Sequence, residues 1–272
     1  MVTTMSDRII TLMTDFGYRD PYVGVMKGVI KSINPGVEII DLTHGINRHN
    51  IVEAAVVLMV SARYFPPGTI FVVVVDPGVG SSRRAIVVET SNYILVGPDN
   101  GCLSLLALKD GVKRVVDISN SRYRLSNVSH TFHGRDIFAP VAAWISRGIP
   151  LEVIGTEIPI DSLKTIRIEP PRISDDSIEG HALYIDIYGN VMTNISEDEA
   201  YSILKLGDRV EIIHQGGKSR CTFTTSFSIV NPGEVACYIN SWGYLEVAVN
   251  NGSATDVLGI TQGSRLLFKK LP

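Results

Sequence analysis

The sequence predicts an α/β protein whose second part is a smaller β-barrel domain. Over the first two-thirds of the chain, apolar strand patterns alternate with helix patterns, as in a largely parallel sheet with helices on its faces. A pair of prolines at 170–171 and the Ser/Asp-rich stretch after it are typical of a linker. Beyond this linker, short strands separated by glycine turns indicate a small barrel.

The N-terminal α/β domain is expected over residues 7–168. The segment 22–33 places its apolar residues on one face and stops at Asn34-Pro35-Gly36, which predicts an amphipathic helix. Asn50 is a suitable N-cap for the apolar helix that follows it. The expected elements are strands over 9–13, 37–42, 69–76, 85–89 and 93–96, and helices over 22–33, 51–64 and 138–147.

The linker is expected over 169–178 and the C-terminal β-barrel domain over 179–272. Ser196, with Glu199 three residues later, forms a capping box that predicts the one helix of this domain. The expected strands cover roughly 180–187, 208–214, 220–228, 234–240, 244–250 and 264–269.

The bulk composition excludes several classes of protein. The chain has 272 residues, of which 45% are hydrophobic and 19% charged, so a packed core is expected. The net charge of −3 gives no reason to expect a nucleic acid or an anionic membrane as partner. No apolar run is long enough to span a membrane, and residues 1–6 resemble a frayed leader rather than a signal peptide. The cytoplasm is therefore the expected location.

The cysteines predict neither a disulfide framework nor a thiolate zinc site. Cys102, Cys221 and Cys237 are odd in number and show no CxxC spacing. The last two lie in apolar, strand-like segments, so they are expected to be packed thiols.

Acidic residues follow several of the predicted strands of the first domain. Asp15, Asp41 and Asp76 come where strands end, and such ends share one edge of a parallel sheet. A divalent-metal site is disfavoured, because the spacing matches no compact ligand motif. Asp41 is better explained as a cap between a strand and the next helix. Asp15 precedes a helix N-terminus, a common place for an acid that binds a ribose diol.

Two charged clusters stand out in the first domain. Asp76 leads the glycine turn 77–80, with Arg83 and Arg84 close behind it. This turn is not a phosphate loop, because it lacks the Walker lysine and its aspartate would repel phosphate. The second cluster covers residues 131–136 and also lies at the start of an apolar segment.

In the second domain, two turns carry aromatic and polar side chains. The first holds Asp186, suited to an ammonium group, Tyr188, suited to stacking, and Asn190, suited to the edge of a base. Each could equally be part of an ordinary hairpin. The second turn covers residues 240–244.

Taken together, these segments resemble those of a known protein family. The chain resembles the S-adenosylmethionine hydroxide adenosyltransferase family, which is related to the fluorinase and the chlorinase. The similarity runs in order through nearly the whole chain. It is carried by TDFG (14–17), PYVG-x-MKG (21–28), INP (33–35), DLTH (41–44), VDPGVGS-x-RR (75–84), PDNG (98–101), TFHGRDIFAP (131–140), IDIYGNVMTNI (185–195) and INSWGYLEVAVNNGSA (239–254).

The resemblance implies a reaction and an assembly. Members of the family split S-adenosylmethionine with water into adenosine and methionine, so S-adenosylmethionine would be the substrate. They have an N-terminal α/β domain and a C-terminal β-barrel, and they form homotrimers with each site between two subunits. No metal and no other cofactor is expected, because the leaving group is a neutral thioether.

The resemblance also implies roles for residues. Asp76, Arg83 and His133 match the catalytic trio, with Arg84 as the alternative to Arg83; Asp76 would orient the water, and His133 would be the final proton acceptor. Asp15 matches the acid that binds the ribose. Asp186 and Asn190 match the contacts to the methionine amino group and the adenine, and Ser241 matches a contact to the methionine carboxylate. The expected substrate-binding set is Asp15, His49, Phe132, Gly134, Asp186, Tyr188, Asn190, Ser241, Trp242 and Ala254.

Departures from the halogenases bear on the nucleophile. The fluorinase carries a tyrosine at the position of Asp76 and a halide-binding serine at Gly134, while the chlorinase also has a glycine there. Because a carboxylate would repel a halide and can accept a hydrogen bond from water, water is favoured. His49 stands where the halogenases have a tryptophan. Trp242 stands where they have an arginine, which leaves the methionine carboxylate to Ser241 and backbone donors.

Two alternatives to hydrolysis remain. One is a chlorinase-like 5'-halo-5'-deoxyadenosine synthase, and the other is a non-catalytic adenosine-binding protein.

Overall fold

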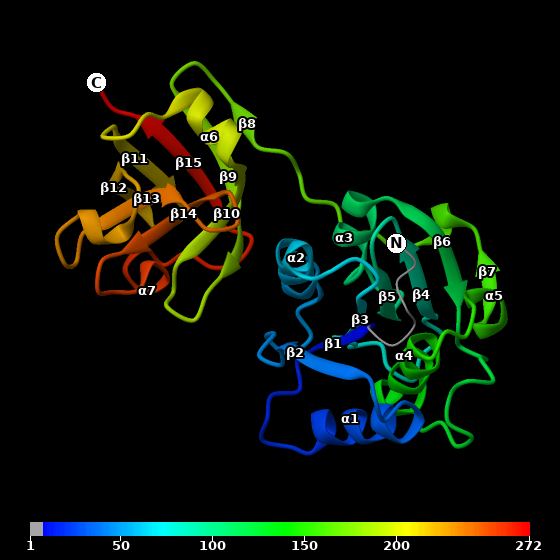
Figure 1. Cartoon of the computed structure of the whole chain (residues 1–272). Helices are drawn as coiled ribbons and strands as arrows, with labels where there is room; N and C mark the ends of the chain where they lie inside the picture. Colours follow the sequence, from blue (N-terminus) through cyan, green and yellow to red (C-terminus); the bar gives the residue numbers. More distant parts are fainter. Residues whose placement is uncertain (1–7) are drawn as a thin grey trace. The chain divides into compact units, whose positions relative to one another are not determined.

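The computed structural model describes residues 8–272, which form two compact units, one ending at Ile166 and the other running from Arg167 to Pro272 (Figure 1). The predicted leader at residues 1–6 and the first residue of the predicted α/β domain lie outside the described residues. Each unit has a hydrophobic core of its own.

The first unit is built on a seven-stranded sheet in the order β2-β1-β3-β5-β4-β6-β7. The first four strands of this order are parallel neighbours, and the other three are added antiparallel. The parallel centre is thus confirmed, and β4 is antiparallel to β5 because a tight turn joins them. The strands are β1 (Ile9–Thr14), β2 (Glu38–Thr43), β3 (Ile70–Val74), β4 (Ala85–Thr90), β5 (Ile94–Pro98), β6 (Val112–Asp117) and β7 (Thr156–Ile158).

Helices cover this sheet. Helix α1 (Tyr22–Ile33) packs with α4 (Ala139–Ser146) on one side, and α2 (Ile51–Ser61) packs with α3 (Ser104–Asp110) on the other (Figure 1). Asn50 caps α2 as predicted, since its Oδ1 accepts the Glu53 N–H at 3.0 Å. The last turn predicted for this helix is a separate 3₁₀ turn, η1 (Ala62–Tyr64). Helix α3, strand β6 and the short helix α5 (Leu151–Ile154) were not predicted.

The second unit is a closed barrel, as predicted, but it has seven strands where six were expected. Its strands pair in the order β10-β14-β13-β12-β11-β15-β9, and a β10–β9 pairing closes the ring. The two-residue strand β8 (Arg172–Ile173) is added outside β9. The barrel strands are β9 (Ser177–Ile185), β10 (Val191–Ser196), β11 (Arg209–His214), β12 (Gly217–Phe223), β13 (Val235–Ile239), β14 (Tyr244–Val249) and β15 (Arg265–Lys270).

The helices of the barrel unit partly correct the prediction. Ser196 and Glu199 form the predicted capping box at the start of α6 (Glu197–Ile203). A second helix, α7 (Ala254–Leu258), was missed, because Ser253 caps only five residues of helix. Strand β10 was also missed; its residues follow the 186–190 turn directly and are buried on both faces, so they lack strand alternation.

Cys221 on β12 and Cys237 on β13 form a disulfide, which corrects the prediction of two packed thiols. Their Cα atoms lie 5.9 Å apart across neighbouring strands. The odd cysteine count excluded a complete set of pairs, but it did not exclude one pair. The third cysteine, Cys102, is free and buried, and burial raises the pKa of its thiol.

The disulfide is expected to add about 3 kcal/mol to the free energy of unfolding, the contribution typical of a bond that closes a loop of about 15 residues. The two cysteines are 16 residues apart in the chain. Urea unfolding of the unchanged chain, Cys237→Ala and Cys102→Ala would measure it. Cys102→Ala removes a thiol that is equally buried but forms no disulfide. This variant should therefore lose clearly less free energy of unfolding. Equal losses in the two variants would contradict the assignment.

Candidate active site

A cavity of about 320 Å³ opens at the carboxyl ends of β1 and β3 in the first unit. Asp15 and Asp76 follow these two parallel strands, so both carboxylates reach the same edge of the sheet. His49, Phe132, His133 and Gly134 also line the cavity. Asp20, Tyr22 and Arg48 line it as well, although the sequence analysis did not single them out.

Three side chains from two separate segments of the chain meet at this cavity. The Arg83 Nε donates to both carboxylate oxygens of Asp76, at 2.9 and 3.0 Å, and its Nη2 also donates to Asp76. The same Nη2 lies 2.7 Å from Nδ1 of His133. Asp76 and Arg83 are almost completely buried, with 5% and 10% of their side chains exposed. The predicted trio is therefore one hydrogen-bonded cluster.

The neighbouring arginine belongs to a different cluster. Arg84 donates from Nε to Asp99 at 2.8 Å and from Nη1 to the Ser162 hydroxyl at 3.1 Å. Because successive side chains of an extended segment point to opposite sides, Arg83 and Arg84 cannot both face Asp76. The geometry thus separates the two arginines, and Arg83 is the one in contact with Asp76 and His133.

The contact with Arg83 determines the protonation state and the tautomer of His133. Burial and the nearby guanidinium lower the pKa of His133, so the imidazole is neutral near pH 7. A guanidinium only donates, so Nδ1 must be the accepting nitrogen and Nε2 carries the proton. In this arrangement the Nδ1 lone pair is already occupied.

The backbone after His133 explains the glycine that follows it. Residues Gly134–Phe138 form a π-helical turn, η2. A Cβ atom on Gly134 would lie 3.1 Å from the Met26 sulfur and 3.2 Å from the Phe132 ring. A side chain here therefore needs its neighbours to shift. The turn is anchored by the buried Asp136, whose Oδ2 accepts from both the N–H and the hydroxyl of Ser129.

Asp15 is held by the backbone of a residue with an unusual conformation. Its Oδ2 accepts the His49 N–H at 2.9 Å, and His49 has a φ of 65°. Such a conformation is uncommon outside glycine and typical of functional loops. The backbone of His49 therefore has a defined contact, and the residue also lines the cavity.

A buried pair of His44 and Asp41, which no sequence pattern indicated, supports the strand end that precedes Asp15. His44 is fully buried, and its Nδ1 lies 2.8 Å from the Thr14 hydroxyl. Its Nε2 lies 3.1 Å from Asp41, which also accepts from Lys27 Nζ at 2.6 Å. Burial alone would raise the pKa of Asp41, but hydrogen bonds from Lys27 and His44 lower it. Asp41 is thus an ion-pair partner rather than only a cap.

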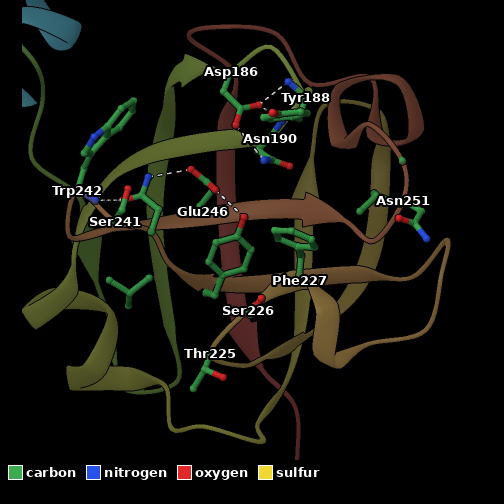
Figure 2. Close-up of a pocket in the computed structure, with 15 residues that line it drawn as sticks. Asp186, Tyr188, Asn190, Thr225, Ser226, Phe227, Ser241, Trp242, Glu246 and Asn251 are labelled. Carbon is green, nitrogen blue, oxygen red and sulfur yellow. Dashed lines mark hydrogen bonds between the residues drawn. The ribbon is translucent and has the colours of Figure 1, made fainter. Parts of the chain in front are cut away.

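The second unit holds a separate, larger cavity of about 790 Å³ (Figure 2). Five of the predicted residues line it, namely Asp186, Tyr188, Asn190, Ser241 and Trp242. Asp186 Oδ1 accepts the N–H groups of Tyr188 and Asn190, both at 2.9 Å, and its Oδ2 accepts Asn190 Nδ2 at 2.9 Å. This turn presents a carboxylate and an amide together. Ala254 is buried at the start of α7 and does not line the cavity.

Among the lining residues that were not predicted, Glu246 is the one with an acidic side chain. It accepts from the Tyr238 hydroxyl at 2.6 Å and from Asn240 Nδ2 at 2.8 Å (Figure 2). Burial raises the pKa of this carboxyl group. An acid within the apolar run Leu245–Val249 was the available signal.

Within residues 8–272, no group of three or more His, Cys, Asp or Glu side chains is arranged to hold a metal ion. Among the described helices, none is both long and apolar enough to cross a membrane.

Comparison with known proteins assigns both units to one family. The family model for the SAM hydroxide adenosyltransferase N-terminal domain matches residues 10–155, and the model for the C-terminal domain matches residues 180–267. The chain belongs to the SAM hydroxide adenosyltransferase family. The two models match in the order of the two units and together cover most of the chain.

Individual members and relatives of this family can be compared along nearly the whole chain. A protein of Methanocaldococcus jannaschii named (R)-S-adenosyl-L-methionine hydrolase is 38% identical, over 93% of this chain and 92% of its own length. The crystal structure of an uncharacterized conserved protein from Thermotoga maritima has a TM-score of 0.90 at 39% identity, covering 95% of this chain and 99% of that one. A fluorinase of Nocardia brasiliensis is more distant, at 27% identity over 93% of this chain and 94% of its own.

Proposed function

We propose that this chain hydrolyses S-adenosylmethionine to adenosine and L-methionine. The observation that carries the proposal is the cluster of Asp76, Arg83 and His133 at the cavity of the first unit. A carboxylate at this position suits a water nucleophile and repels a halide ion. The names of the hydrolase relatives specify the (R) form of the sulfonium centre, and we extend this preference to the present chain.

In the proposed mechanism, a water molecule held by Asp76 attacks C5' of the ribose in line with the departing sulfur. The C5'–S bond breaks with its electron pair on sulfur, so a neutral thioether leaves and needs no acid. The attacking oxygen must lose a proton, and the Asp76 carboxylate is the acceptor. Arg83 fixes the carboxylate through its bonds to both oxygens, and His133 fixes Arg83 through Nδ1.

The other contacts of the substrate follow from the predicted residues. Asp15 would bind the ribose diol, with His49 and Phe132 beside it in the cavity, while Asn190 and Tyr188 would bind the adenine. Asp186 would bind the methionine ammonium, and Ala254 remains a predicted contact. Apart from Ala254, these residues divide between the two cavities. We therefore propose a homotrimer in which each site combines the first unit of one subunit with the second unit of its neighbour. A cytoplasmic location and the lack of a cofactor likewise remain predictions.

The test is product analysis after incubation with a mixture of the two sulfonium epimers, with and without chloride. Adenosine and methionine should form in equal amounts, and only the (R) epimer should be consumed. 5'-Chloro-5'-deoxyadenosine in place of adenosine would indicate a halogenase. Tight adenosine binding without methionine release over hours would indicate a binding protein. Light scattering of the same sample would test the trimer.

A further inference from the structure

A fully buried carboxylate lies close to the catalytic cluster, and the proposed mechanism does not use it. Asp136 belongs to the π-helical turn η2, and none of its side chain is exposed. It does not line the cavity of the first unit. Burial alone would raise the pKa of Asp136, but hydrogen bonds from Arg135 and Ser129 lower it, so the group is ionised. A buried charge is costly unless such partners compensate for it, and the partners indicate what the carboxylate holds in place.

Asp136 holds the loop of residues 129–132, which leads into His133. Its Oδ2 accepts the N–H of Ser129 at 2.8 Å and the Ser129 hydroxyl at 2.7 Å. The same hydroxyl accepts the Phe132 N–H at 3.1 Å, and the Asp136 N–H donates to the Phe132 carbonyl at 3.1 Å. Both ends of the 129–132 loop are thus tied to the turn η2.

This loop contacts the catalytic cluster on two sides. Burial lowers the pKa of His133, and hydrogen bonding with the Ser129 backbone acts in the opposite direction, so Ser129 lies beside the imidazole. The His130 carbonyl packs against the glycine turn that follows Asp76, where a Cβ atom on Gly80 would lie 2.3 Å from the carbonyl oxygen. The position of the loop therefore affects the position of the catalytic side chains.

We propose that Asp136 is a positioning residue for the hydrolysis of S-adenosylmethionine. It fixes the 129–132 loop, and the loop fixes His133. His133 in turn holds Arg83, which holds the Asp76 carboxylate. This inference rests on the proposed function. Asp136 takes no proton itself, so its loss should slow the reaction by displacing the carboxylate that does, since a small displacement of a reacting group costs much of the rate.

The first experiment measures kcat and KM of Asp136→Asn for S-adenosylmethionine. Asparagine keeps the size of the side chain but loses the charge to which Ser129 and Arg135 donate. We expect kcat to fall by about 10- to 100-fold and KM to change by less than about threefold, because Asp136 acts on the reacting groups and does not line the cavity.

Asp99→Asn serves as the control, because Asp99 is an equally buried acid of the same unit that pairs with Arg84 and does not line the cavity. Its kcat should stay within about twofold of the unchanged chain. Equal kcat values for Asp136→Asn and Asp99→Asn would overturn the inference. Failure of the unchanged chain to hydrolyse S-adenosylmethionine would instead overturn the proposed function.

A double variant tests whether Asp136 acts through His133. If it does, adding Asp136→Asn to His133→Ala should lower kcat by less than about threefold, because the contact that Asp136 supports is already lost. A purely structural role gives no such coupling. A combined loss equal to the product of the two single losses would show that the residues act independently and would overturn the inference.

A matched pair of variants at Ser129 tests the link between Asp136 and the loop, and it also serves if Asp136→Asn fails to fold. Threonine and valine have nearly the same size, but only threonine keeps the hydroxyl that donates to Asp136 and accepts from Phe132. We expect kcat of Ser129→Val to lie about five- to tenfold below that of Ser129→Thr. Equal kcat values in the two folded variants would contradict the proposed route.

Discussion

Replacing Asp76 with asparagine is expected to lower the turnover of S-adenosylmethionine by about 10²–10⁴-fold, the usual effect of losing an acid–base group. The amide has the size of the carboxylate but cannot take a proton from the attacking water. It also offers one acceptor oxygen where Arg83 now donates to two. Adenosine should still bind, because Asp15 and the rest of the cavity are unchanged. Turnover measured by adenosine release, with adenosine binding measured by calorimetry, separates the two effects.

The matched control is Asp99→Asn. Asp99 is equally buried, with 2% of its side chain exposed, and it is paired with the neighbouring Arg84 rather than with Arg83. Its replacement removes a comparable ion pair from the same unit without touching the cavity. Thermal unfolding of both variants would show any loss of structure. Rapid turnover by Asp76→Asn would remove this carboxylate from the mechanism.

Local signals were enough to predict much of this fold. Helix α1 begins and ends where its apolar periodicity and the following Asn-Pro-Gly predict. The caps at Asn50 and Ser196 were readable, because each depends on residues within one helical turn. The acids at the ends of β1 and β3 were readable for a similar reason, since parallel strands bring their carboxyl ends to one edge.

Features that depend on contacts between distant segments could not be predicted. Arg83 and Arg84 are neighbours in the chain, so no local pattern tells them apart. Their different partners, His133 for Arg83 and Asp99 for Arg84, come from distant segments. The Cys221–Cys237 disulfide depends on β12 and β13 being neighbours, which no local pattern states. The same holds for Glu246, whose partners Tyr238 and Asn240 come from the adjacent strand and its turn.

The role of His133 can be separated from that of a proton acceptor by a pair of variants. His133→Ala is expected to lower turnover by about 10²-fold, because Arg83 loses its acceptor and the geometry around Asp76 loosens. His133→Asn should retain most of the activity near neutral pH. The asparagine Oδ1 takes nearly the place of the imidazole Nδ1 and can accept from Arg83 in the same way. Neither variant carries a titratable group at this position, and only the asparagine can accept the hydrogen bond from Arg83.

The pH dependence of the same proteins gives an independent measurement. Because the pKa of His133 is lowered below its usual 6.5 by burial and by Arg83, the neutral form prevails until the pH falls well below that value. Protonation then turns Nδ1 into a donor facing the guanidinium, so kcat/KM of the unchanged enzyme should fall about tenfold per pH unit on the acid side. In His133→Asn this fall should be absent over the same pH range, because asparagine does not titrate there. If His133→Asn is instead as slow as His133→Ala at every pH, the imidazole itself takes the proton, and the assignment of Asp76 as the proton acceptor is wrong.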